Sequence, residues 1–340
     1  MSLLSDDRIL LSHGAGGKKS SELTEKIFLK HFNDPALLGL NDMAVLELPA
    51  GRVSMSTDTY VVDPIFFPGG DIGSLAIHGT VNDVAMAGAV PVAISVAFIL
   101  EEGLPLIDLE RIAGSMALAA VEAGVRIVTA DTKVVPRGAA DKVFINTTGI
   151  GIIPDGINVS GACARVGDRI LLSGTIGDHG IAIASSRDGI EFKTTVRSDS
   201  APLNGMISEL VNSLGQDIHV LRDPTRGGLA TVMSEIATQS TVCVQIEETT
   251  IPVREAVKGA CELLGYDPLY LANEGKLVAV VAQNASDRAL EIMKSSKYGI
   301  DACIIGEITG DNPGKVILKT VMGGSRLVDK LSGEMLPRIC

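Results

Sequence analysis

The chain alternates between short apolar runs and segments in which apolar residues recur every three or four positions. The runs predict β-strands and the periodic segments predict helices. In the first half the predicted strands are Met43–Leu48, Arg52–Thr57, Val92–Leu100, Arg126–Val135 and Lys142–Ile153, and the predicted helices are Asp71–Gly88 and Leu106–Gly124. Pro49-Ala50-Gly51 separates the first two strands and predicts a hairpin.

After a turn at Pro154-Asp155-Gly156 the pattern begins again. The second half contains predicted strands at Arg169–Ser173, Thr241–Ile246, Lys276–Ala282, Ala302–Ile308 and Lys315–Thr320, and predicted helices at Ile176–Ser186, Pro202–Leu214, Gly228–Gln239, Val253–Leu264 and Ala285–Ser296. A chain of 340 residues is long for a single core. We therefore expect two domains, 1–158 and 159–330, followed by a flexible tail, 331–340.

Composition narrows the class of protein. Hydrophobic residues make up 46% and charged residues 21% of the chain, and 37 glycines favour a soluble α/β (α+β) protein with tight turns. The net charge of −12 disfavours a partner made of nucleic acid. Five cysteines without a CxxC pair favour reduced thiols in the cytoplasm over zinc ligands or disulfides. Gly88 and Pro91 interrupt the longest uncharged run, so no membrane span is expected.

A glycine-rich loop near the N-terminus, HGAGGK, is a candidate phosphate-binding segment. Its residues Gly14, Gly16, Gly17 and Lys18 could bring backbone N–H groups and a lysine close to phosphates. The glycine spacing matches neither a P-loop nor a dinucleotide fingerprint, and a simple turn explains the loop equally well.

Polar side chains also stand at the ends of predicted strands and inside one apolar helix: Asp58, Asn82, Asp83, Asp131 and Asp223. Burying a carboxylate such as Asp83 is costly unless it is paired, capped or bound to a metal. Oxygen ligands suit Mg²⁺, which commonly bridges substrate phosphates. Any one of these residues alone could be structural, but together they favour an ATP-using enzyme outside the P-loop class.

The last residue, Cys340, is a candidate carrier thiol. Chain ends are usually mobile, and the ten residues before the terminus reach roughly 33 Å when extended. A thiol at that position could carry a covalent group between two sites. The alternative is that Cys340 is a terminal cysteine without a function.

The order of the motifs HGAGGK, STDTYVV, FFPGGDIG, GTVNDVAMAGAVP, TADTKVV, RDPTRGGLA, NEGK and a final PRIC resembles the HypE family of hydrogenase-maturation proteins. That family belongs to the superfamily of aminoimidazole ribonucleotide synthetase, selenophosphate synthetase and thiamine monophosphate kinase. The resemblance covers essentially the whole chain. The PRIC terminus is specific to the HypE branch, whereas GTVNDVAMAGA is typical of the superfamily.

The resemblance implies a two-domain PurM-like fold, in which the N-terminal sheet closes a β-barrel across a homodimer and the C-terminal domain is α/β. It implies ATP-dependent dehydration of an S-carbamoyl group on Cys340 to a thiocyanate, the source of the cyanide ligand of nickel–iron hydrogenase. The implied partners are a carbamoyltransferase of the HypF type and an iron-carrying scaffold of the HypC–HypD type. The implied cofactors are ATP and Mg²⁺.

Matching the motifs residue by residue gives site assignments. The implied metal ligands are Asp58, Asp83, Asp131 and Asp223, and the implied nucleotide-binding residues are Gly14, Gly16, Gly17, Lys18, Asp58, Asn82, Asp83 and Asp131. Cys340 would carry the carbamoyl group, Lys133 would stabilise charge and Glu274 would accept a proton. An amide oxygen becomes a leaving group once phosphorylated, and this chemistry needs positioned cations and a base.

Two other functions remain open. The first is another enzyme of the same superfamily, although selenophosphate synthesis would require a reactive cysteine in the glycine loop, and residues 13–21 contain none. The second is a non-catalytic nucleotide-binding scaffold, which would bind ATP without releasing phosphate.

Overall fold

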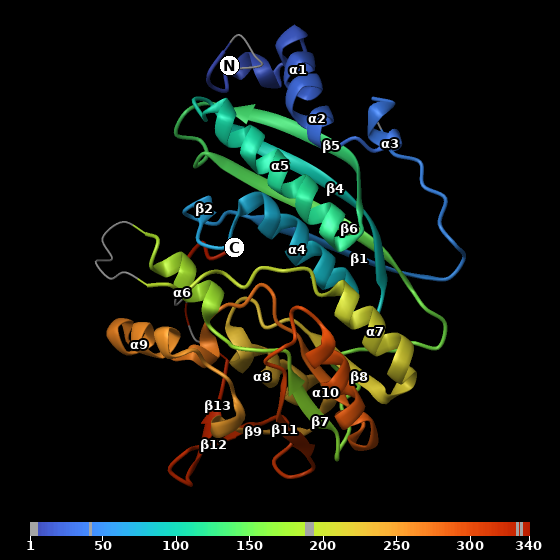
Figure 1. The fold of residues 1–340 in the computed structure, drawn as a ribbon, viewed down its shortest axis with the longest axis vertical. Helices are drawn as coiled ribbons and strands as arrows, with labels where there is room; N and C mark the ends of the chain where they lie inside the picture. Colours follow the sequence, from blue (N-terminus) through green and yellow to red (C-terminus); the bar gives the residue numbers. More distant parts are fainter. Residues whose placement is uncertain (1–5, 41–42, 188–193, 331–332, 334–335) are drawn as a thin grey trace.

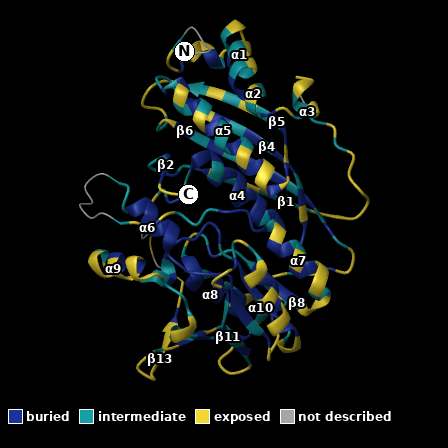
Figure 2. Ribbon diagram, in the orientation of Figure 1, coloured by how far each residue is buried: buried dark blue, intermediate teal, exposed yellow. Residues whose placement is uncertain are grey.

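The computed structural model describes residues 6–40, 43–187, 194–330, 333 and 336–340. Two β-sheets lie one above the other, each with its own helices, and the C-terminus lies between them (Figure 1). Buried residues fill both halves and the region where they meet (Figure 2). The junction between the halves is therefore a packed interface that contains the chain end.

The N-terminal sheet has four strands. Its elements are β1 (Arg52–Tyr60), β4 (Val90–Glu101), β5 (Arg126–Val135), β6 (Val143–Ile153), α4 (Ile72–Ala85) and α5 (Leu106–Ala123). The strand order is β1-β6-β4-β5, and only the β4–β5 pair is parallel. Helix α4 begins at an N-cap, Asp71, whose Oδ1 accepts the N–H groups of Gly73 and Ser74. Helix α5 ends at Gly124, whose φ of 68° suits glycine.

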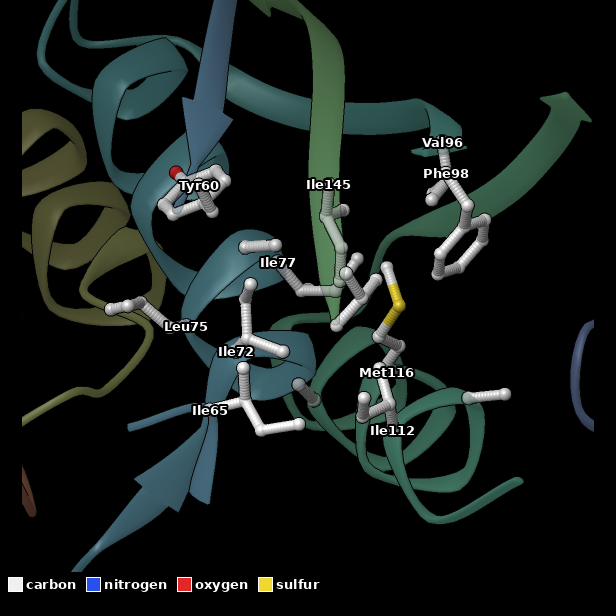
Figure 3. Close-up of a cluster of buried hydrophobic side chains, with 14 of the residues drawn as sticks. Tyr60, Ile65, Ile72, Leu75, Ile77, Val96, Phe98, Ile112, Met116 and Ile145 are labelled. Atoms are coloured by element: carbon white, nitrogen blue, oxygen red, sulfur yellow. The ribbon is translucent and has the colours of Figure 1, made fainter. Parts of the chain in front are cut away.

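One face of this sheet is covered by α4 and α5. The core between them is aliphatic with a few large side chains, including Tyr60, Phe98, Met116, Ile77 and Ile145 (Figure 3). Gly79 allows α4 to approach β1 closely, because a Cβ there would lie 2.3 Å from the Tyr60 hydroxyl oxygen. The opposite face carries exposed apolar side chains, with Met55 70% and Val53 50% exposed.

The C-terminal sheet has seven strands. Its elements are β7 (Arg169–Leu172), β8 (Ile218–Arg222), β9 (Cys243–Glu247), β10 (Val278–Val281), β11 (Cys303–Thr309), β12 (Val316–Lys319), β13 (Ser325–Val328), α7 (Asn204–Leu214), α8 (Gly228–Ser240), α9 (Glu255–Leu264) and α10 (Ser286–Ser295). The order is β13-β12-β9-β11-β7-β10-β8. Alternate residues of β10 face opposite layers: Val278 and Val280 share a core with α8, whereas Ala279 and Val281 pack with α7 and α10.

Short elements connect these layers. They are η1 (Leu11–Gly14), α1 (Lys18–Leu23), η2 (Thr24–Phe28), α2 (Leu29–His31), α3 (Pro35–Leu38), β2 (Phe66–Phe67), β3 (Gly70–Asp71), α6 (Asp178–Ala184), η3 (Gly215–Asp217), η4 (Glu248–Thr250), η5 (Pro268–Tyr270) and η6 (Gln283–Ala285). The N-terminal helices lie beside β5, at the edge of the four-stranded sheet.

The predicted mixed fold with two sheets and helices is confirmed, and every predicted helix has a counterpart. The predicted strand Met43–Leu48 and its hairpin are wrong, because the described residues 43–50 pair with no strand of this chain and Val45 is 76% exposed. Strands β8 and β13 and the N-terminal helices were not predicted, because their apolar runs are short. Most strand pairs are antiparallel, which makes the sheets α+β in type.

The two sheets divide between Ile153 and Arg169, and the predicted domain boundary near residue 158 falls in this interval. The boundary itself remains a prediction. Part of the predicted tail lies outside the described residues. Among the described residues, no helix is both long and apolar enough to cross a membrane.

Candidate functional site

The C-terminal tail is docked between the two halves by main-chain hydrogen bonds. The Val61 N–H donates to the Cys340 carbonyl oxygen over 3.0 Å, and the Asp63 N–H donates to that of Arg338 over 3.2 Å. The Arg338 guanidinium returns a 2.8 Å bond to the Val61 carbonyl and pairs with Asp141 at 2.6 Å. Ile339 is 6% exposed and joins the N-terminal core. The residues after β1 therefore bind the tail much as a strand binds its neighbour.

Two side chains near helix α6 complete the tail site. His179 Nε2 lies 2.8 Å from the Ile339 carbonyl oxygen, and its Nδ1 lies 2.8 Å from the Ser198 hydroxyl. A carbonyl only accepts, so Nε2 carries the proton. Burial lowers the pKa of His179, which keeps the ring neutral. Arg187 donates to the carbonyl oxygens of Pro337 and Arg338, the latter over 2.9 Å.

The Cys340 thiol lies in an acidic environment. Burial raises the pKa of the Cys340 thiol, and the nearby Glu274, Asp58 and Asp83 raise it further, whereas Arg226 acts in the opposite direction. The docked thiol is therefore protonated at neutral pH. With no group attached to its sulfur, the docked Cys340 is a poor nucleophile, because the thiolate is the reactive form.

Glu274 is fixed by groups from three segments. Its N–H donates to Asp199 Oδ1 over 3.1 Å, and its own carbonyl accepts from the Asn82 amide at 3.4 Å. Lys276 pairs with the other oxygen of Asp199 at 2.9 Å. Glu274 is 3% exposed, and burial followed by the charge of Asp223 raises the pKa of Glu274 well above its ordinary value. Burial and the neighbouring acids thus favour the neutral form of Glu274, and a nearby positive charge would favour the carboxylate.

Three further carboxylates gather beside Glu274. Asp83, in the last turn of α4, accepts from the Ser56 hydroxyl at 2.8 Å, and burial raises the pKa of Asp83. The negative end of the α4 dipole disfavours its charge as well. Burial and the charge of Asp83 raise the pKa of Asp223 to about 7, and Asp58 acts on both electrostatically. Together with Glu274, these residues form an acid cluster (Asp58, Asp83, Asp223 and Glu274). In this cluster, burial and mutual repulsion outweigh the nearby arginines, so the pKa values of Asp83 and Asp223 stay raised.

The acid cluster has oxygen donors suited to Mg²⁺ but no preformed cage. Within the described ranges, no group of three or more His, Cys, Asp or Glu side chains is arranged to hold a metal ion. Mg²⁺ bound with phosphates needs only one or two carboxylates and keeps several waters. The donor set therefore fits an ion that arrives with a nucleotide.

A second polar region lies at the edge of the N-terminal sheet. A cavity of about 340 Å³ is lined by His13, Gly14, Gly16, Asp131, Lys133 and apolar side chains of the N-terminal helices. Gly14 approaches β5 so closely that a Cβ would lie 2.8 Å from the Val134 nitrogen. Gly17 caps α1, and the Lys18 side chain is 90% exposed. Apolar walls beside a glycine loop and a lysine fit a nucleotide base and its phosphates.

Asp131 and Lys133 do not join the acid cluster within one chain. Asp131 is in register with Ala97, Asn146 and Thr59 on the neighbouring strands, so their side chains lie on one face of the sheet. Asp58 precedes Thr59 in β1 and therefore lies on the opposite face. Three strand spacings, about 14 Å in all, separate β5 from β1. Within one chain Asp131 therefore lies apart from Asp58, and its assignment as a metal ligand stays a prediction. Lys133 pairs with Asp131 at 3.0 Å and lowers the pKa of that carboxyl.

Asn82 joins α4 to the second domain. Its Oδ1 accepts the Leu203 N–H at 2.8 Å, and its amide donates to the Ala201 and Glu274 carbonyl groups. Its assignment to the nucleotide stays a prediction. The sequence analysis missed Asp199, Lys276, His179 and Arg187. Lys276 stands in the NEGK motif beside Glu274, which was the available indication for it.

The fold and these motifs define a two-domain protein of the AIR synthase related class. The family model for the N-terminal domain of AIR synthase related proteins matches residues 40–153, and the model for the C-terminal domain matches residues 165–319. A structure of thiamine monophosphate kinase, AaThiL, shares the fold with a TM-score of 0.62 at 18% identity.

Within that class, the chain belongs to the HypE family. It is 53% identical to "Carbamoyl dehydratase HypE" of Rhizobium leguminosarum bv. viciae over 99% of this chain and 96% of the relative. The structure of HypE in complex with ATP has a TM-score of 0.94 and 53% identity, covering 97% of this chain and 99% of that one. HypE in a HypE–HypF complex gives a TM-score of 0.80 at 51% identity, covering 91% and 99%.

Proposed function

We propose that this protein is a carbamoyl dehydratase that converts an S-carbamoyl group on Cys340 into a thiocyanate at the expense of ATP. The observation that carries the proposal is the docked tail, whose terminal thiol lies within electrostatic reach of the acid cluster and the fixed Glu274. The full-length similarity to relatives named carbamoyl dehydratase supports it. The product would supply the cyanide ligand of a nickel–iron hydrogenase.

The chain would contribute position and charge to the first step. The tail hydrogen bonds hold Cys340, so that a carbamoyl group on its sulfur meets the γ-phosphate of ATP. Transfer would form a bond from the carbamoyl oxygen to the γ-phosphorus and break the bond between that phosphorus and ADP, and one N–H proton would pass to water. Phosphoryl transfer of this kind depends on positioning and on neutralised charge.

Glu274 would act in the second step as the base. The C–O bond breaks, phosphate leaves, and the remaining proton on the imino nitrogen passes to the carboxylate, leaving S–C≡N. A carboxylate with a raised pKa is a stronger base than an ordinary one. Asp199, Lys276 and Asn82 would keep that carboxylate in place through the Glu274 backbone.

ATP and Mg²⁺ are the proposed cofactors. Bound Mg²⁺ would supply positive charge to the phosphate oxygens, and Asp58, Asp83 and Asp223 are the residues that would hold it. The raised pKa values of Asp83 and Asp223 support this role, since burial and the neighbouring acids outweigh the nearby arginines. Gly14, Gly16 and Lys133 would bind the nucleotide, while the exposed Gly17 and Lys18 would close over it.

A homodimer would unite the two separated regions. The open face of the N-terminal sheet exposes Met55, Val53 and Ile99, which is unusual for a surface that stays in water. Two such faces packed by a two-fold axis would form the barrel expected from the sequence and bury these side chains. Asp131 and Lys133 of one chain would then face the acid cluster of its partner.

The proposed partners are a carbamoyltransferase of the HypF type, which loads Cys340, and an iron-carrying scaffold of the HypC–HypD type, which takes the cyanide. The HypE–HypF complex among similar structures supports the first of these. We further propose that the protein works in the cytoplasm and that its domains are residues 1–158 and 159–330.

Mass spectrometry of the C-terminal peptide 331–340, released after Lys330, tests the proposal. The protein is incubated with ATP, Mg²⁺, carbamoyl phosphate and the carbamoyltransferase, with a non-hydrolysable ATP analogue as control. We expect a carbamoyl adduct on Cys340 that loses one water only with hydrolysable ATP. A stable adduct and no phosphate release would instead favour the nucleotide-binding scaffold.

A further inference from the structure

A cavity opens directly beside the docked thiol. Its volume is about 420 Å³, and its walls include Cys340, Arg226, Thr59, Thr231 and Tyr270. It is separate from the glycine-loop cavity at the sheet edge, with which it shares no lining residue. A group attached to the sulfur could therefore extend into it while the tail stays in place.

Two arginines line that wall, Arg226 and Arg338, and Arg338 is already paired with Asp141 at 2.6 Å. Arg226 is the second residue of a tight turn, Thr225–Gly228, in which the Gly228 N–H donates to the Thr225 carbonyl at 2.9 Å. Gly227 and Gly228 both have positive φ, at 76° and 61°, and a Cβ on Gly228 would strike the Leu269 oxygen. The glycines thus fix the turn that presents Arg226, which is exposed.

Arg226 forms no salt bridge with the residues that the structure describes, although its charge lowers the pKa of Asp83 from a distance. Its neighbour Arg222, by contrast, pairs with Glu235. The Asn273 amide and N–H both bind the Pro224 carbonyl, at 2.9 and 3.1 Å, which anchors the start of the turn to the segment that carries Glu274. An anchored, unpaired guanidinium beside a cavity is suited to bind an anion.

We propose that Arg226 and this cavity form a phosphoryl subsite, which binds the phosphate attached to the carbamoyl oxygen and then the inorganic phosphate that leaves. The inference rests on the proposed function. A dianionic phosphate would bring negative charge next to the acid cluster, and a cation on the thiol side would stabilise it there. The planar guanidinium can bind two phosphate oxygens at once. The C–O bond then breaks with the phosphate already held, and the imino proton goes to Glu274.

The test compares Arg226→Met and Arg226→Lys with the matched control Arg222→Met, which removes a nearby positive charge that does not line the cavity. One readout is single-turnover dehydration of protein already carrying the carbamoyl group. The other needs no turnover: it is the rate at which iodoacetamide alkylates Cys340 at increasing concentrations of inorganic phosphate. Arg226 lies on an exposed turn, and Arg222 ends β8 with its side chain 31% exposed, so all three variants should fold.

We expect Arg226→Met to slow the single turnover on the order of 100- to 1,000-fold at saturating ATP, with Arg226→Lys in between. Inorganic phosphate should protect Cys340 in the wild type and in Arg222→Met, and not in Arg226→Met. Equal protection in wild type and Arg226→Met would overturn the subsite. If wild-type protein forms no thiocyanate, the proposed function fails. The alkylation rates at increasing phosphate concentration still show whether Arg226 binds phosphate.

Discussion

The edge cavity and the domain junction hold the same kinds of residue in opposite electrostatic states. At the edge, Asp131 and Lys133 are 66% and 67% exposed and pair with each other, so the pKa of Asp131 falls. At the junction, Asp223 and Glu274 lie among other acids, so their pKa values rise. The paired charges at the edge are stabilised, whereas burial and neighbouring acids disfavour the charged forms of Asp223 and Glu274 at the junction. Binding and proton transfer are thus assigned to different places.

The largest expected effect comes from removing the thiol. Cys340→Ala should abolish carbamoyl loading and thiocyanate formation, because no other described cysteine lies in the tail site. The fold and nucleotide binding should be intact, since the tail docks through main-chain atoms. Mass spectrometry and ATP-binding calorimetry check this. Loss of ATP binding in the variant would contradict a purely carrier role.

Glu274→Gln should lower the dehydration rate on the order of 100- to 10,000-fold while leaving loading unchanged, because the isosteric amide cannot accept the proton. Lys133→Ala should also inactivate the enzyme, because Lys133 would bind the nucleotide at the edge of the sheet. Single-turnover rates on loaded protein measure both variants. A normal dehydration rate for Glu274→Gln would show that Glu274 does not accept the proton.

Mixing these two inactive variants tests whether the regions meet across a dimer. If Lys133 of one chain serves Glu274 of the other, mixed dimers contain one intact site, and random exchange restores about a quarter of wild-type activity. If each site lies within one chain, no activity returns. The measurement is thiocyanate formation after subunit exchange, with each variant alone as the control.

Asp83→Asn should raise the Mg²⁺ concentration needed for half-maximal phosphate release on the order of tenfold, because one oxygen donor of the acid cluster loses its charge. The variant should remain folded, since Ser56 can still donate to the amide oxygen. Phosphate-release assays across a magnesium series give the answer. An unchanged magnesium dependence would exclude Asp83 from the metal site.

The smallest effect concerns stability without ligands. The folded pKa of Asp223, about 7, lies above the unfolded value of 3.8, so its favourable contribution is complete below about pH 4 and is lost as pH rises to 7. Asp223→Asn should therefore be more stable than wild type at pH 8, by on the order of 2 kcal/mol after allowing for partial exposure, and similar at pH 4.

Thermal unfolding at both pH values, with nucleotide and magnesium absent, measures this difference. Asp131→Asn is the matched control, because its pKa is lowered and its carboxylate is exposed. It should show no gain at pH 8. An equal gain in both variants would mean that net charge, and not the junction, sets the effect.

Much of the fold could be predicted from the sequence because its periodicities are local. All predicted helices and most strands exist, and the predicted helix end at Gly124 and turn at Gly156 both have glycine in the left-handed region. The strand Met43–Leu48 failed because a strand needs a neighbour, and a sequence pattern does not supply one. Motif order also sufficed to identify the family, since its members share the whole chain.

The sequence by itself determined which chemical groups this protein has: the terminal thiol, the glycine loop, the acids and Glu274. Only the tertiary structure decided how they are grouped. It put Asp131 and Asp58 on opposite faces of one sheet, used Asn82 as a link between domains, and docked the tail so that burial raises the thiol pKa. The physical reason is that side-chain direction and desolvation depend on contacts between distant segments, and no local pattern encodes them.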